Sequence, residues 1–252
     1  FLLSGDLDNQ ITSSNFAARG LNIPYLGLFG ACSTSMQGLA LGSKLLDNDG
    51  ANYVMVATAS HNAAAEKQFR YPTEYGAQKP PTAQWTVTGA GAVILGKVGN
   101  GPRVVSATIG KVVDMGISDP FNMGAAMAPA AVDTIATHLN EMNLEPDYYD
   151  LIATGDLGHT GYTITQELLK KKGIHLKENL YTDCGILIYG NDPRVFSGAS
   201  GCACSAIVTY GHFLNRLKRG ELSRILITAT GALLSPFVCG ESPPRSKPNS
   251  FC

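Results

Sequence analysis

The chain of 252 residues carries 19 basic and 20 acidic side chains, which gives a formal net charge of −1. Charged residues make up 15% of it, against about 25% in an average globular protein, and hydrophobic residues make up 44%. This composition indicates a large buried core. It argues against the basic surface of a nucleic-acid-binding protein, and no apolar run approaches the roughly 18 residues of a membrane-spanning helix.

The first part of the chain predicts strands that alternate with helices. Short apolar runs rich in β-branched residues indicate the strands, and longer apolar stretches between turn residues indicate the helices. In chain order we expect a strand at Phe1–Ser4, a helix near Ser13–Arg19, a strand at Tyr25–Phe29, a turn at Gly30–Ser33, a helix at Met36–Leu46 and a strand at Tyr53–Ala57.

The middle of the chain predicts further strands at Gly89–Leu95 and Val104–Ile109, followed by a helix at Asp133–Met142. The last 14 residues, 239–252, differ in character because they contain three prolines among serines and charged residues. Proline cannot continue a strand, so we expect a disordered tail there.

The second part of the chain repeats the order of the first. The matching segments are a strand at Tyr149–Thr154, a helix near Ile164–Lys172, an apolar segment Gly185–Tyr189, a turn at Gly198–Cys204, a helix that ends near Leu217 and a strand at Arg224–Ala229. Cys32 precedes Gly50 by 18 residues, and Cys202 precedes Gly220 by the same number. The chain therefore reads as a duplication.

The duplication predicts an α/β protein with partly parallel sheets and two related halves. We place the first half at residues 1–110, the second at 111–238 and the atypical tail at 239–252. Two unrelated α/β units that match by chance are the alternative. The repeated order of elements and the equal 18-residue intervals make that alternative the weaker one.

Cys32 lies where an apolar strand passes into an apolar helix. The N-terminus of a helix can stabilise a thiolate or offer its N–H groups to a bound anion, so we expect Cys32 to face a pocket. An inert buried cysteine is the alternative. The six cysteines are few for the chain length, which favours reduced thiols, and Cys202-Ala-Cys204 lacks the spacing of a zinc site.

A cysteine nucleophile needs a base, and the chain has five histidines. His138 and His212 fall inside helical stretches and are expected to serve packing or the surface, and His175 lies in a lysine-rich loop. His61 and His159 follow strands and remain the candidates for a base near Cys32.

The segment Glu66–Pro81 is the least core-like part of the middle of the chain. It includes Arg70, Lys79 and two tyrosines, which together suit a planar anionic ligand because guanidinium pairs with carboxylate and rings stack. A solvated loop or a dimer contact explains the same composition equally well.

The two elbows, Gly30–Ser35 and Ser200–Ser205, resemble the duplicated core of thiolases and ketoacyl-acyl carrier protein synthases. A more specific similarity is to the stage V sporulation protein AD family, from residue 1 to about 236. The strings that carry it are GDLDNQIT, LFGACSTSM, SHNAAAEKQFRYPTEYGAQKP, VTGAGAV, MGAAMAPAAVDTI, SGASGCACSA and ATGALLSP.

The resemblance implies a thiolase-like αβαβα fold and a role in moving dipicolinic acid into the developing spore. It also implies peripheral association with the spore inner membrane in the forespore, with other subunits of a membrane complex as partners and a homodimer left open. The first half is then expected to lack part of its start. The tail after Pro236 departs from the family.

The resemblance also bears on catalysis. Condensing enzymes of this fold carry a histidine after the first strand of the second half and an asparagine or histidine in the later glycine-rich loop. Here these places read Gly155-Asp156-Leu157 and Gly201-Cys202-Ala203. Cys32 thus keeps the place of the nucleophile without its recognised partners, which favours a binding protein over an enzyme.

We therefore expect a non-catalytic binder of pyridine-2,6-dicarboxylate, with no cofactor of its own and calcium carried only with the ligand. The alternatives are an acyltransferase that uses Cys32 with His61 or His159, and a scaffold subunit with a vestigial pocket. Asp6 and Asp156 would orient donors or hold a metal-bridged ligand, unless each caps a helix. The expected ligand-binding residues are Cys32, Ser33, Asp6, His61, Arg70, Lys79, Asp156 and Cys202.

Overall fold

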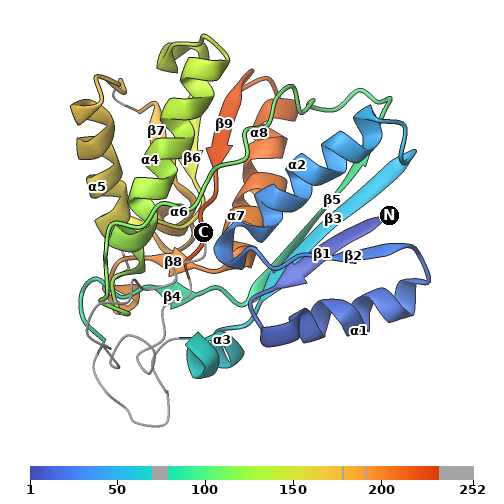
Figure 1. Cartoon of the computed structure of the whole chain (residues 1–252), viewed down its shortest axis with the longest axis horizontal. Coiled ribbons are helices and arrows are strands. Elements are labelled where there is room, and N and C mark those ends of the chain that lie inside the picture. Colours follow the sequence, from blue (N-terminus) through green and yellow to red (C-terminus); the bar gives the residue numbers. More distant parts are fainter. Residues whose placement is uncertain (70–78, 178, 191, 233–252) are drawn as a thin grey trace.

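The computed structural model describes residues 1–69, 79–177, 179–190 and 192–232. Helices and sheets alternate in layers (Figure 1). From one outer face to the other, these are α1 (Thr12–Leu21), a first sheet, α2 (Thr34–Asp47) with α7 (Cys202–Ala206), a second sheet, and α4 (Met123–Glu141) with α5 (Gly158–Lys171).

The first sheet has the strand order β2-β1-β3-β5. Its strands are β1 (Leu2–Asp6), β2 (Tyr25–Gly27), β3 (Tyr53–Ser60) and β5 (Gly89–Gly96). The first three run parallel, and β5 runs antiparallel to β3. All of β1 is buried, as expected for a strand between two parallel neighbours with helices on both faces.

Glycines on α2 bring that helix close to the first sheet. A Cβ atom added at Gly38 would lie 2.6 Å from the Val56 side chain, and one at Gly42 would lie 2.9 Å from Leu95. Leu3, Val54 and other apolar side chains form the core beneath the helix.

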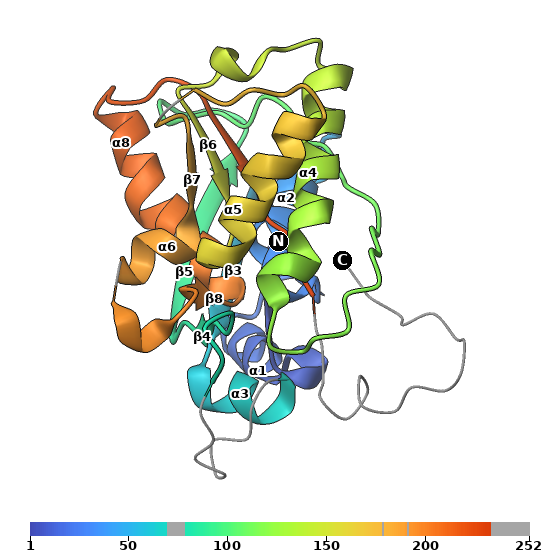
Figure 2. The same ribbon diagram turned by 90° about the vertical axis from the view of Figure 1, so that its left-hand side faces the viewer.

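The second sheet has the order β7-β6-β9, and all its strands are parallel. These strands are β6 (Leu151–Thr154), β7 (Tyr181–Asp183) and β9 (Ile225–Thr228). On one face α4 and α5 pack against it (Figure 2). On the other face lies one helical run, in which α7 continues through a π-helical turn at Ile207–Phe213 into α8 (Leu214–Lys218).

Strand pairing and helix packing both join the halves. The short strand β4 (Trp85–Thr86) pairs in parallel with β8 (Ala199–Ser200), and α2 meets α7 in the central layer, where the Ser35 and Ser205 hydroxyl oxygens lie 2.5 Å apart. The remaining helices are α3 (Asn62–Phe69), α6 (Cys184–Tyr189) and the short turns Asn9–Ile11, Ala31–Ser33, Pro146–Tyr148 and Pro193–Val195. In the described ranges, no helix has the length and apolar character needed to cross a membrane.

The expected α/β architecture and most of the expected elements are present, but three expectations were wrong. Val104–Ile109 forms no strand: neither sheet pairs with it, and Val105 and Ile109 are 79% and 81% exposed. Its β-branched residues favour a strand only where a neighbouring strand completes the hydrogen bonds.

The other two errors concern helices. The apolar segment Gly185–Tyr189, which we matched to a strand of the first half, belongs to α6, because Asp183 caps the helix at Ile186 and the strand ends before it. The helix expected from Asp133 begins at Met123 and continues through Pro129, which alanines flank. The expected disordered tail lies outside the described residues.

Candidate functional site: the paired elbows

The first elbow fixes Cys32 by local hydrogen bonds. Ala31 adopts a left-handed backbone conformation with φ of 48°, which turns the chain sharply before α2. The Ser33 hydroxyl donates to the Gly30 carbonyl at 2.6 Å, and the Thr34 hydroxyl donates to the Ala31 carbonyl at 2.7 Å. Cys32 is 3% exposed, and Ser33 is half-buried.

The second elbow is built around Gly201, whose φ of 110° only glycine adopts readily. Cys202 begins α7 directly after it, is fully buried and donates through its thiol to the Ala59 carbonyl at 3.2 Å. Burial, followed by electrostatic interactions with Cys32 and Asp6, raises the pKa of the Cys202 thiol well above its ordinary value. The elbows meet in one apolar cluster, formed by Leu7, Ala31, Cys32, Ala65 and Cys202.

A hydrogen-bonded chain connects Cys32 to the second half. The Cys32 sulfur lies 3.7 Å from the Ser200 hydroxyl, and that hydroxyl donates to Asp156 Oδ2 at 2.9 Å. The same carboxylate oxygen accepts the Gly201 N–H at 2.9 Å. Since the Ser200 proton is directed to Asp156, the Ser200 oxygen is the acceptor for the Cys32 thiol.

Sequence reasoning did not include Ser200 among the site residues. Ser200 is the first residue of the second elbow, two positions before Cys202, so the duplication itself was a signal that could have found it. Its pairing with Cys32 follows from the β4–β8 contact that brings the halves together.

The two aspartates at or just beyond the end of the first strand of each half have different roles. Asp6 accepts the Asp8 N–H at 2.8 Å and both the N–H and the hydroxyl of Ser14, at 2.9 and 2.8 Å, so it fixes the start of α1. Asp156 holds the second elbow instead. At the start of α5, the N–H groups of Leu157 and Gly158 donate to the Asp183 carboxylate at 2.8 and 3.0 Å.

Of the cationic residues expected at the site, Lys79 is already paired. The Lys79 ammonium lies 2.5 Å from the carboxylate of the fully buried Glu66 and 4.2 Å from the centre of the Trp85 ring. His61 is exposed at the start of α3. Arg70 lies outside the described residues.

The other histidines fall largely where the sequence placed them. His138 is buried on α4, where its ring nitrogens lie 2.8 Å from the Thr108 hydroxyl and 2.7 Å from the Tyr149 hydroxyl. His175 and His212 are exposed, and His159 is half-buried. His138 thus serves the packing of the second half, whereas a base role for His61 or His159 stays a prediction.

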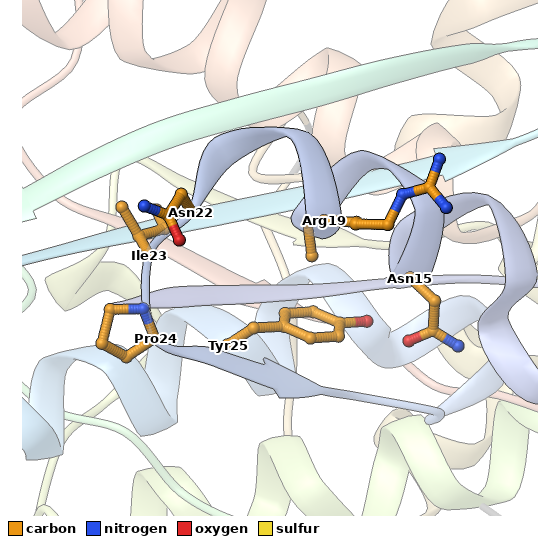
Figure 3. Close-up of a pocket in the computed structure, with 7 residues that line it drawn as sticks. Asn15, Arg19, Asn22, Ile23, Pro24 and Tyr25 are labelled. Atoms are coloured by element: carbon orange, nitrogen blue, oxygen red, sulfur yellow. The ribbon is translucent and has the colours of Figure 1, made fainter.

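Cys32 lines neither of the two best-formed hollows in the described part of the chain. An open groove of about 500 Å³ runs between α1 and β2, with Asn15 and Arg19 on the helix and Pro24 and Tyr25 opposite them (Figure 3). A second hollow, near Glu66 and Lys79, has room for about one water molecule.

Backbone covers the first elbow where we expected a pocket. A Cβ atom added at Gly231 would lie 2.6 Å from the Gly30 carbonyl oxygen and 3.1 Å from the Cys32 nitrogen. The segment after β9 therefore packs directly on the elbow, and only a glycine fits there. Cys32 is closed off in this conformation.

Sequence comparison assigns the family. The model of the family described as "Stage V sporulation protein AD (SpoVAD)" matches residues 1–244. The chain belongs to this family. The stage V sporulation protein AD of Bacillus subtilis (strain 168) is 54% identical over 235 residues, which cover 93% of this chain and 69% of that protein. The chain is therefore a sporulation protein, as its resemblance to the SpoVAD family implied.

Solved structures place the SpoVAD chain in the thiolase-like fold. OleA from Xanthomonas campestris, with bound lauric acid and lauroyl-CoA, aligns with a TM-score of 0.59 at 13% identity, over 87% of this chain and 67% of that one. The 3-oxoacyl-(acyl carrier protein) synthase III of Pseudomonas aeruginosa PAO1 aligns with a TM-score of 0.57 at 14% identity, over 92% and 74%. At these identities the likeness establishes the fold alone, and it confirms the expected fold class.

Proposed function

We propose that this SpoVAD chain binds pyridine-2,6-dicarboxylate, as its calcium chelate, for uptake into the developing spore, and that it does so without catalysing a reaction. Membership in a sporulation family supports the biological setting. The observation that carries the non-catalytic role is the chain of hydrogen bonds from Cys32 through Ser200 to Asp156.

This series of hydrogen bonds favours the protonated thiol of Cys32. A nucleophilic cysteine needs a group that removes its proton, and a neutral histidine is the usual one. The Ser200 hydroxyl already gives its proton to Asp156, so it can only accept from the thiol. Ionising Cys32 would place a second negative charge near the buried Asp156 carboxylate, which opposes thiolate formation.

The charges around the elbows favour the calcium chelate over the free dianion. Asp6 and Asp156 are 2% and 0% exposed, and both act electrostatically on Cys202. Lys79 is neutralised by Glu66. A ligand with two carboxylates would be repelled here, whereas calcium cancels its charge and leaves a neutral planar molecule.

We place the ligand between the elbows, against the backbone N–H groups near Cys32, Ser33 and Cys202. Asp6 and Asp156 keep the elbows in shape, and His61, Arg70 and Lys79 belong to the segment that would border the ligand. Because Gly231 packs on the first elbow, binding requires the segment after β9 to move away from Cys32.

Isothermal titration calorimetry tests the proposal. Dipicolinate with calcium should release or absorb heat with a saturable isotherm, and dipicolinate with a calcium chelator present should bind much more weakly. Benzene-1,3-dicarboxylate is the matched control, since it has the same carboxylates but no ring nitrogen for the metal. An absence of saturable heat with both dipicolinate forms would end the proposal.

We further propose that the protein works as a peripheral subunit of a spore inner-membrane complex in the forespore, with a homodimer as one arrangement. Large apolar side chains on α1 and the segment after it support a protein partner: Phe16, Leu21, Ile23, Leu26 and Phe29 are 40–63% exposed. Sedimentation of the chain and of a Leu26→Lys variant would show whether this surface pairs two copies.

A further inference from the structure

The loop between β6 and α5 is fixed by a single buried carboxylate from a neighbouring strand. Asp183, at the end of β7, is 0% exposed and accepts four hydrogen bonds. The donors are the Thr154 hydroxyl at 2.7 Å, the Leu157 N–H at 2.8 Å, the Gly158 N–H at 3.0 Å and the Ile186 N–H at 3.2 Å. Thr154 lies just before the loop between β6 and α5, and Leu157 and Gly158 lie at its end, so Asp183 holds the loop from both sides.

The same loop carries Asp156, and its path leaves little freedom. Gly158 has a φ of 64°, and a Cβ atom there would lie 2.3 Å from the Ser197 carbonyl oxygen. The Asp156 carbonyl accepts from the Gln84 amide at 2.7 Å, while its carboxylate holds Ser200 and Gly201. A shift at Leu157 or Gly158 must therefore move Asp156.

We propose that Asp183 is a positioning residue for the elbow site: it fixes residues 155–158 and thereby sets the position of Asp156, of Ser200 and of Cys32. The ligand role of that site rests on the proposed function, whereas the positioning itself does not. The hydrogen-bond donors to Asp183 are Thr154, Leu157, Gly158 and Ile186 rather than elbow residues, so Asp183 acts on the elbows through Asp156.

The charge state of Asp183 decides how well it holds the loop. As a carboxylate it accepts from all four donors at the cost of a buried charge, whereas as a carboxylic acid it accepts fewer of them without that cost. Burial raises the pKa of Asp183 to about 6, which brings this change near neutral pH. The titratable groups that face it are Asp156, Tyr162 on α5, Tyr181 on β7, Cys184 on α6 and Cys204 on α7.

Hydrogen exchange of the loop amides tests the positioning directly. In Asp183→Asn, exchange of residues 155–158 should rise about tenfold, the factor that corresponds to the loss of one hydrogen bond to a charged group. In the wild type, burial raises the pKa of Asp183 above its value in an opened loop, so exchange corrected for its intrinsic rate should fall as the pH falls through about 6, and the variant should lose this pH dependence. Asp192→Asn is the matched control, because Asp192 also accepts N–H groups at the start of a turn but lies far more exposed.

Thr154→Val provides a milder variant if Asp183→Asn does not fold, since it removes one of the four donors and keeps the side-chain shape. It should loosen the same residues to a smaller extent. Unchanged exchange at 155–158 in the folded variant, or a rise spread evenly over the chain, would overturn the proposal.

A second readout separates this proposal from the ligand assignment. Maleimide labelling of Cys32, followed by mass spectrometry, should quicken in Asp183→Asn and in Ser200→Ala but not in Asp192→Asn. If the wild type binds no dipicolinate while these labelling rates change as described, the ligand assignment fails and the positioning role stands. Equal labelling rates in all forms contradict the positioning role.

Discussion

The hydroxyl oxygens of Ser35 and Ser205 lie 2.5 Å apart, and each serine follows its elbow cysteine by three residues. Both side chains are fully buried. The duplicated helices that follow Cys32 and Cys202 therefore meet through equivalent residues.

The serine pair predicts a non-additive mutant cycle. Ser35→Ala or Ser205→Ala alone leaves one buried hydroxyl without its partner and should lower the free energy of unfolding by about 1–3 kcal/mol. The double variant should lose less than the sum of the two. Urea unfolding measures all four forms, with Ser43→Ala on the outer part of α2 as control. Additive losses would show that the hydroxyls do not depend on each other.

Lys79 should matter for stability because Glu66 has no access to water. Lys79→Met removes the ammonium that lies 2.5 Å from the buried Glu66 carboxylate, and breaking a buried pair in this way costs about 3–5 kcal/mol. Lys44→Met removes a cation from an exposed pair with Asp47, where the side chains are 67% and 72% exposed, and should leave the urea midpoint unchanged. Equal midpoints for the two variants would contradict a buried pair.

His138 should destabilise the fold at mildly acidic pH. Burial lowers the pKa of His138 from its ordinary value of 6.5, so the unfolded chain takes up a proton there before the folded chain does. The free energy of unfolding should therefore fall as the pH drops through 6.5. His138→Gln should flatten this dependence, as followed by thermal unfolding between pH 5 and 8. A variant with the wild-type pH dependence would assign the effect elsewhere.

Asp183 should act in the opposite direction. Its pKa rises from an ordinary 3.8 to about 6, so its contribution to stability is fully present below about pH 4 and is lost as the pH rises through 6. The difference corresponds to about 3 kcal/mol at neutral pH. In the His138→Gln background, Asp183→Asn should remove this loss. Stability that instead rises with pH in that background would contradict the sign.

Cys32 should not form an acyl intermediate. Incubation with acyl-coenzyme A followed by mass spectrometry should leave Cys32 unmodified, because its proton is held in the chain to Ser200 and Asp156. Cys32→Ala should keep the binding of calcium dipicolinate within a few-fold. A stable acyl adduct on Cys32 would favour the alternative of a cysteine-dependent acyltransferase.

The sequence could predict the duplicated architecture because duplication leaves a regular spacing. The intervals from Cys32 to Gly50 and from Cys202 to Gly220 place both elbows at the starts of helices, as the structure shows. Contacts between separate segments could not be predicted in this way. Neither the pairing of Ser200 with Cys32 nor the ion pair of Lys79 with Glu66 follows from local pattern, since each depends on how separate segments pack.

Other differences arise where local preference competes with the surroundings. Val104–Ile109 has the composition of a strand but finds no pairing partner, and Gly185–Tyr189 becomes helical because Asp183 caps it. The sequence also could not predict that the first elbow is covered, because Gly231, which packs on it, lies 199 residues after Cys32. Such contacts require three-dimensional information.

A crystal structure of the chain with calcium dipicolinate would test the binding site most directly. The account predicts density for the ligand between the two elbows, beside the backbone of Cys32 and Cys202, with the segment around Gly231 displaced from the first elbow. Ligand density elsewhere, with Cys32 still covered as it is now, would contradict it.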